Sequence, residues 1–431
     1  MFKRVFGFLF LLLIAVPLAA QDDDPFASQP RLDREALVRA VLERNPNLQA
    51  AREAWRAAAA RPAQVRSLED PTVSYGIAPL SIGSDVDFGQ ELEVSQMLPY
   101  PGKRRVRSAM AEAEAETARE QYRAARLELA TAAALGFDDY YRVHRALEIN
   151  AEHRRLLDEL HEIATARYAA GLVPQQEPLQ AEVEAAELMH RDVQLRAERT
   201  MVKARLNALL HRRPDAGLPP PPDSLPELPP LGVAGDLEDA AVAARPEIAA
   251  RAAEIRAREA EVEMARLERK PDFGVMSSYN SMWTDKEHRF MVGASVSLPV
   301  RKERLEAARI EAEARLAQAR NELAGMEDEI RSQVRESVAR ITEALHLLEL
   351  YESRLLPASR DQIRAGRAGY VTGQSEFLSV LEAERTLRRV ELGHQEALAA
   401  LYQRRAELER ALGRLPGGLT VPESPDEGGP R

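Results

Sequence analysis

The sequence contains an internal duplication, and the second copy follows the first at an almost constant offset. Recurring landmarks lie 200 residues apart early in each copy and 202 apart late in it. They are Pro46 and Pro246, Leu98-Pro99 and Leu298-Pro299, and Tyr168 with Gly171 and Tyr370 with Gly373. A repeat of this length is the duplication of a whole topological unit. The fold therefore has to explain why two copies of the unit are needed.

The first residues have the pattern of an export signal. Lys3 and Arg4 precede an apolar run from Val5 to Val16, and small residues follow up to Ala20. This order predicts a signal peptide over residues 1–20. The alternative is an uncleaved anchor helix, for which the apolar run is short. We expect the protein to be exported.

Charge and cysteine content exclude several classes of protein. The net charge is −10, which argues against a nucleic-acid partner. There is no cysteine, so neither disulfides nor a lipid on an N-terminal cysteine are expected. His144, His153 and His161 are spaced nine and eight apart, unlike metal ligands on a helix. We expect no cofactor, no metal site and no enzymatic activity.

Each copy reads as a helix, two strands, a very long helix, a turn and a returning helix. Leu32 to Ala60 and Leu237 to Arg269 are the expected first helices. The first repeat spans residues 21–213, with strands at about 72–80 and 88–98 and a helical hairpin at about 103–212, its tip near 169–177. The second repeat spans 232–415, with strands at about 272–281 and 289–298 and a hairpin at about 302–414, its tip near 369–376.

Proline-rich segments separate and close the repeats. Residues 214–231 are expected to be a stiff extended connector, because Pro214 to Pro230 holds eight prolines. The tail, residues 416–431, is expected to be disordered.

The strands and the long helices each show their own period. Phe290, Val292, Ala294, Val296 and Leu298 alternate with small or polar residues, the period of a strand. The long helices carry apolar seams with spacings of three and four, as coiled coils do. The seams are Leu129, Ala133, Gly136, Tyr140, Val143 and Leu147 in copy one, and Ile330, Val334, Ser337, Ile341, Leu345 and Leu348 in copy two.

Strand length suggests a membrane role. Nine to eleven residues is the length that a tilted strand needs to cross a bilayer. Four strands cannot close a barrel, whereas three chains would supply twelve. A soluble β-sandwich carrying a coiled-coil stalk is the alternative at this point.

Two tips and one junction resemble the TolC-type outer-membrane efflux channels, the outer membrane factors of tripartite efflux systems. One tip is the segment from Tyr168 to Val173, which leads to Glu177, and the other runs from Gly369 to Gly373 and leads to Glu382. The junction, Ser95 to Arg104, resembles that of the heavy-metal (cation) efflux branch.

The resemblance implies a mainly α fold with a small β part, assembled as a homotrimer. Its twelve-strand transmembrane β-barrel would lie in outer-membrane lipid and continue into an α-helical barrel in the periplasm. The trimer would be the exit duct for metal cations or small toxic compounds, joined to a periplasmic adaptor and an inner-membrane transporter. The rival interpretation is a periplasmic coiled-coil adaptor or stalk protein, although adaptors carry one helical hairpin rather than two.

The resemblance also implies residue roles. The periplasmic gate maps to Glu382, Tyr370, Glu177 and Ser379, and the adaptor-contact tips map to Gly171, Leu172, Val173 and Gly373. Ser375 stands where the family's best-known member has an arginine that supports the closed gate. We therefore expect this gate to close in a different way.

The basic run from Lys103 to Arg107 needs its own explanation. It lacks the interleaved aromatic residues of a nucleic-acid site and the glycine spacing of a phosphate loop. A position close to lipid headgroups suits it better.

Overall fold

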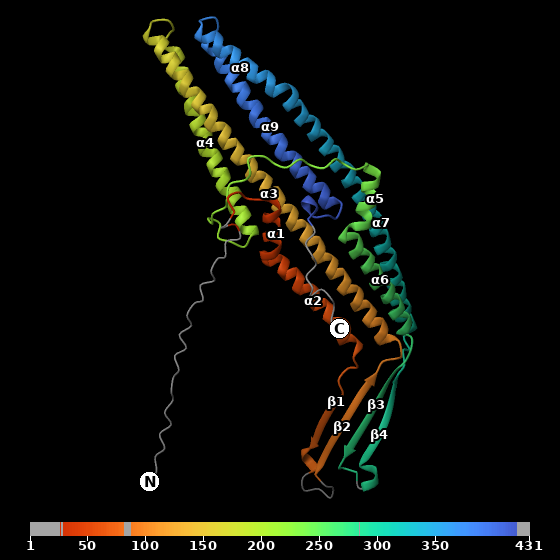
Figure 1. Cartoon of the computed structure of the whole chain (residues 1–431). Helices are drawn as coiled ribbons and strands as arrows, with labels where there is room; N and C mark the ends of the chain where they lie inside the picture. The colour runs from red at the N-terminus through yellow and green to blue at the C-terminus, as the bar shows by residue number, and fades with distance from the viewer. Residues whose placement is uncertain (1–25, 27–28, 82–87, 284, 420–431) are drawn as a thin grey trace, which may run out of the picture.

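The computed structural model describes residue 26 and residues 29–81, 88–283 and 285–419. The molecule is elongated, with helices along most of its length and a small sheet at one end (Figure 1). The expected signal peptide, residues 1–20, and residues 420–431 of the expected tail lie outside the described residues.

The first repeat contains four helices and two strands among the described residues. They are α1 (Arg34–Arg44), α2 (Pro46–Arg66), β1 (Thr72–Ala78), β2 (Gly89–Leu98), α3 (Lys103–Ala169) and α4 (Gln176–Leu209). The second repeat has the same order, with one helix divided. Its elements are α5 (Ala234–Ala244), α6 (Pro246–Leu267), β3 (Asp272–Asn280), β4 (Phe290–Ser297), α7 (Lys302–Leu350), α8 (Leu356–Val371) and α9 (Phe377–Ala411).

Proline divides the first helix of each repeat, where the sequence had predicted one helix. Asn45 and Arg245 both have extended backbone, because a residue before proline is forced out of the helical region. Pro46 and Pro246 then begin the next helix, a position at which proline's missing N–H costs nothing. Asn45 also caps α2 by accepting bonds from the amides of residues 47 and 48.

The four strands form one antiparallel sheet in the order β1-β2-β3-β4. The central pairing, β2 with β3, joins the first repeat to the second. The strands are one or two residues shorter than predicted. After β1, residues 79–81 form a short 3₁₀ helix instead of continuing the strand.

The two faces of the sheet differ sharply. One face carries apolar rungs such as Tyr75, Leu92, Tyr279 and Phe290, which lie opposite one another across all four strands. Its side chains are exposed, up to 75 % for Val292. The other face carries most of the serines of β1–β4 and two glutamates on β2, whereas Ser277 lies on the apolar face. The strands extend past the helix ends, so this apolar face is left uncovered in the single chain (Figure 1).

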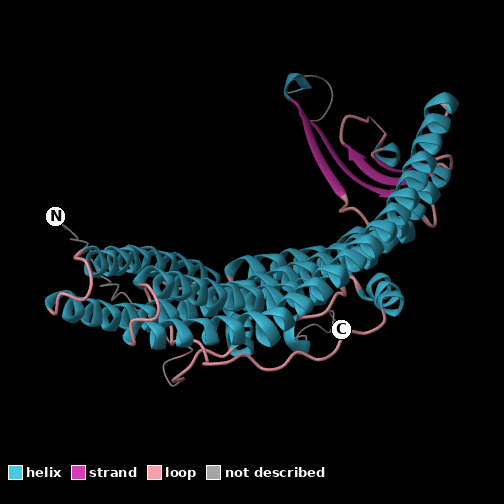
Figure 2. Ribbon diagram, turned by 90° about the horizontal axis from the view of Figure 1, so that it is seen from above, coloured by secondary structure: helices cyan, strands magenta, loops and turns pink. Residues whose placement is uncertain are grey.

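The helices run side by side as a long, curved bundle (Figure 2). The 67 residues of α3 are continuous, which makes this helix about 100 Å long. Its counterpart in the second repeat is interrupted by a π-helical turn, Tyr351–Leu355, just before Pro357. Such a turn is a known way of bending a long helix.

Buried seams hold the bundle together, largely as the sequence predicts. Ala133, Tyr140 and Val143 are buried in one cluster, and Gly136 lies against Leu206 of α4. In copy two, Ile330, Val334 and Ile341 are buried and Leu348 packs beside them. Leu345 departs from the prediction, because its side chain is exposed.

The connector and the start of the tail lie against the helices. Pro220 accepts a hydrogen bond from the amide of Leu32, and Pro226 accepts one from the hydroxyl of Tyr402. Residues 416–419 differ from the expected disorder. Pro416 is buried, and the amide of Gly417 donates to Glu409.

No helix in the described part of the chain combines the length and apolar character that crossing a membrane requires.

Candidate functional site

Both hairpin tips end in the same backbone motif. Gly171 and Gly373 have positive φ, +70° and +77°, a conformation that glycine adopts without strain. The amide of Leu172 bonds back to the carbonyl of Arg167, and the amide of Gln374 bonds to that of Gly369. These bonds, with those from the two glycines, form Schellman motifs that close the helix ends.

The tips present apolar side chains to solvent. Leu172 is 69 % exposed, whereas its neighbour Val173 is half-buried. Val371 on the second tip is also exposed, although no sequence pattern marked it as a contact residue. The exposed Leu172 of the first tip therefore has an equivalent in Val371 of the second tip, as expected of a duplicated unit.

Tyr370 joins the second tip to the first. Its hydroxyl donates to Oε2 of Glu177 at 2.6 Å, so two of the predicted gate residues meet. Its ring is 1 % exposed and packs edge-on against Phe377 at 5.4 Å. Burial and the Glu177 carboxylate both raise the pKa of Tyr370, so the hydroxyl keeps its proton.

Arg167 places a positive charge beside Tyr370. Its guanidinium lies over the Tyr370 ring at 4.5 Å and donates to the Tyr370 carbonyl. Ser375 instead sits against Gly369, where an added Cβ would meet its hydroxyl at 2.2 Å. Sequence patterns did not mark Arg167, because its partner Tyr370 lies on the other hairpin.

The other two predicted gate residues lie away from this contact. Glu382 is exposed and pairs with Arg385 at 2.8 Å, one turn along α9. Ser379 is exposed, and its amide bonds to the carbonyl of Glu376.

A second contact between the hairpins is buried deeper in the bundle. His153 of α3 bonds through Nδ1 to Glu384 at 2.8 Å and through Nε2 to Glu391 at 2.9 Å, both on α9. Burial alone would lower the pKa of His153, but the two carboxylates outweigh it and raise the pKa to about 9. The imidazole is therefore a cation at neutral pH, with both nitrogens donating.

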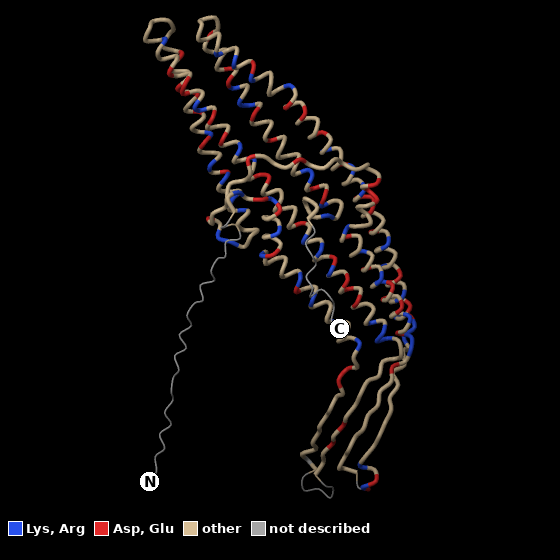
Figure 3. Tube along the Cα trace, in the orientation of Figure 1, with Lys and Arg blue, Asp and Glu red and all other residues tan. Residues whose placement is uncertain are grey.

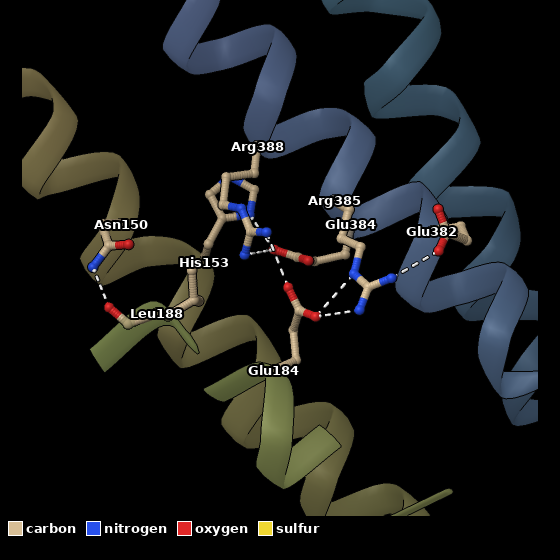
Figure 4. Close-up of polar contacts among 8 residues, drawn as sticks. All are labelled: Asn150, His153, Glu184, Leu188, Glu382, Glu384, Arg385 and Arg388. Carbon is tan, nitrogen blue, oxygen red and sulfur yellow. Dashed lines mark hydrogen bonds and ion pairs between the residues drawn. The ribbon is translucent and has the colours of Figure 1, made fainter. Parts of the chain in front are cut away.

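Glu184 of α4 continues this contact. It accepts bonds from Arg385 at 2.6 Å and from Arg388 at 2.9 Å (Figure 4). Burial opposes ionisation of Glu184, but the two guanidinium groups outweigh it and lower its pKa. Arg388 also lies 3.7 Å from Glu384, which connects the two halves of the cluster.

The charges of this cluster balance. Glu184 and Glu384 are 1 % and 0 % exposed, so unpaired carboxylates here would be strongly destabilising. Four acids face four cations, namely Glu184, Glu382, Glu384 and Glu391 against His153, Arg360, Arg385 and Arg388. We call these eight residues the inter-hairpin cluster.

The inter-hairpin cluster and the tip contact form two layers along the same pair of hairpins. His153 precedes the tip by 17 residues on α3, about 25 Å along the helix. Separating the hairpins would break both layers. Among the described residues, no group of three His, Asp or Glu side chains is placed to hold a metal ion.

Comparison with known proteins identifies the family. The model of the outer membrane efflux protein family matches this chain twice, over residues 37–211 and 237–414. The chain belongs to this family, and the two matches coincide with its two repeats. A search of curated proteins finds no match.

Solved structures share the fold. The outer-membrane channel OprN is 21 % identical, with a TM-score of 0.73 over 90 % of this chain and 95 % of that one. VceC from Vibrio cholerae is 20 % identical, with a TM-score of 0.74 over 88 % and 96 %. CusC, whose structures describe transmembrane channel formation, is 18 % identical, with a TM-score of 0.75 over 88 % and 92 %.

The charge on His153 predicts a pH dependence. Its pKa rises from 6.5 unfolded to about 9 folded, so its contribution of about 3 kcal/mol is complete below pH 6.5. It declines as the pH rises and is lost above pH 9. The thermal midpoint in detergent should therefore fall more between pH 7 and 10 in the natural protein than in His153→Gln.

His190→Gln is the control for that prediction, because His190 is exposed on α4 and, among the described residues, bonds only to Gln194 of its own helix. It should keep the full pH dependence. Equal pH dependence in the natural protein and in His153→Gln would show that His153 is not charged in this way.

Proposed function

We propose that this protein is the outer-membrane exit duct of a tripartite efflux pump. Three chains would place their sheets edge to edge as a twelve-strand barrel, with the helices continuing as a tube in the periplasm. The observation that carries the proposal is the uncovered apolar face of an open four-stranded sheet. Lipid is the solvent such a face requires, and edge pairing removes the unpaired backbone groups that lipid does not tolerate.

The duct would be passive and would rely on partners for energy. The exposed tips, with Leu172 and Val173 on the first and Gly373 in the turn of the second, are the proposed contact with a periplasmic adaptor. An inner-membrane transporter would deliver the cargo, which we propose to be metal cations or small toxic compounds. The four strands carry glutamate and aspartate but no Lys or Arg, which suits cationic cargo. The proposed passive duct requires no catalytic step.

The rival interpretation as a periplasmic adaptor is not favoured. Both repeats match the outer membrane efflux protein family, and each carries its own strand pair and hairpin. Cell fractionation tests the choice. The duct should be found in the outer membrane, should need detergent for extraction and should conduct ions in planar bilayers. A soluble periplasmic protein without conductance would overturn the proposal.

The gate of the duct would be the contact between hairpin tips. Tyr370→Phe keeps the buried ring but removes the hydroxyl that bonds to Glu177. A hydrogen bond to a charged group contributes about 1.5–3 kcal/mol, so the closed state should lose about tenfold or more of its population. Single-channel recording in planar bilayers should show this as a higher open probability.

Tyr168→Phe is the matched control, because Tyr168 is the equivalent tyrosine on the first tip and its side chain is exposed. It should leave the open probability unchanged. An unchanged open probability in Tyr370→Phe would show that the tip contact does not form the gate.

Glu382 would form an acidic ring at the entrance of the trimer, with Ser379 nearby. Three like charges around an axis attract cations. Glu382→Ala should therefore weaken the block of single-channel current by multivalent cations in planar bilayers. Glu396→Ala, an exposed glutamate further along α9, should leave the block intact. Undiminished block in Glu382→Ala would exclude the ring.

A further inference from the structure

The ends of the helices next to the sheet carry a dense group of positive charges. Figure 3 shows Lys and Arg gathered where helices and strands meet. Segments 66–71, 99–107, 266–272 and 299–306 together hold eleven Lys or Arg and six Asp or Glu. Their sum, 11 − 6 = +5, stands against a net charge of −10 for the chain. We call these four segments the basic belt.

The belt begins abruptly at the border of the sheet. No Lys or Arg lies on any of the four strands. After β4, the apolar side chains of Leu298 and Val300 are 67 % and 74 % exposed. Exposed Arg301 and Lys302 follow them directly. Apolar residues that give way to cations within a few positions are typical of the border between lipid tails and headgroups.

Part of the belt's charge is used within the fold. Lys103 is buried and pairs with Asp272 at 2.8 Å, which ties α3 of the first repeat to β3 of the second. Arg269 pairs with Glu306 at 2.6 Å. These cations have structural partners and are not available to a ligand.

Several other cations of the belt have no such partner, and four of them lie close to the ends of the long helices. The side chains of Arg105, Arg301, Lys302 and Arg304 are exposed and make no hydrogen bond or ion pair with any described residue. They come from both repeats, one from the start of α3 and three from the end of the β4–α7 junction and the start of α7. A trimer would repeat them around the whole circumference.

We propose that the basic belt binds the headgroups of anionic phospholipids in the leaflet on the helical side of the membrane. The inference rests on the proposed function, because it requires the apolar face of the sheet to lie in lipid. The belt is continuous with that face, and its charge is opposite to that of a phosphodiester. Each Lys or Arg held at an anionic surface adds attraction that salt weakens. The belt would set the depth and tilt of the duct in the membrane.

The test uses the full-length protein in vesicles of phosphatidylcholine alone or with phosphatidylglycerol. A variant with Arg105→Gln, Arg301→Gln, Lys302→Gln and Arg304→Gln removes four of the unpartnered charges and leaves Lys103–Asp272 intact. The control variant has Arg154→Gln, Arg155→Gln, Arg256→Gln and Arg354→Gln, four exposed arginines on the helices. The readout is the phosphatidylglycerol that stays bound after extraction, counted by native mass spectrometry.

The natural protein and the control variant should retain phosphatidylglycerol over phosphatidylcholine, and added salt should reduce the preference. The belt variant with four substitutions should lose about tenfold or more of this preference, because each removed charge contributes about fivefold. Equal retention of the two lipids by the natural protein, or an unchanged preference in the belt variant, would overturn the proposal. Neither result would bear on the proposed function as an exit duct. Failure of the natural protein to enter either vesicle would instead overturn the proposed function.

Discussion

The rest of the structure depends on the four-stranded sheet, whose outer edges are unpaired and whose apolar face is uncovered. The outer edges of β1 and β4 have no strand partner within the described chain, and the apolar face between them is exposed. An unpaired backbone group in lipid costs several kcal/mol, so strands at membrane depth must close their edges. Two repeats supply four strands, which is too few for closure by one chain. With the sheet in the membrane as proposed, the duplication therefore specifies one part of a larger assembly.

Charged side chains hold the two repeats in register over the length of the molecule. Near the sheet, Lys103 pairs with Asp272. Near the tips, His153 and Tyr370 join the first hairpin to the second. The two layers near the tips differ in kind. The tip contact is one hydroxyl and one carboxylate beside solvent, whereas the inter-hairpin cluster is balanced in charge and holds Glu184, Glu384 and His153 buried. A cluster that loses one partner leaves a buried charge, so this layer would resist separation more strongly.

Sequence patterns predicted the elements because each has a local cause. Period two marks the strands, seams mark the helices, and Gly171 and Gly373 mark the turns. The break at Pro46 was also local, yet the helical composition on both sides hid it. The inter-hairpin cluster could not be predicted from local sequence patterns, because His153 lies 231 residues from Glu384 in the chain. The only signal was weak: Glu384 and Glu391, seven apart, share one face of α9. Arg167 was missed because its partner lies on the other hairpin.

The proposed duct depends on closure of its sheet by neighbouring chains, and the mass of the detergent-solubilised complex tests this most directly. Native mass spectrometry of the full-length protein should show a trimer, with the monomer appearing only when the complex is denatured. A stable monomer that keeps its helices and strands would contradict the account, because its sheet would then need no partner. A dimer would contradict it as well, since eight strands enclose too narrow a space for a duct.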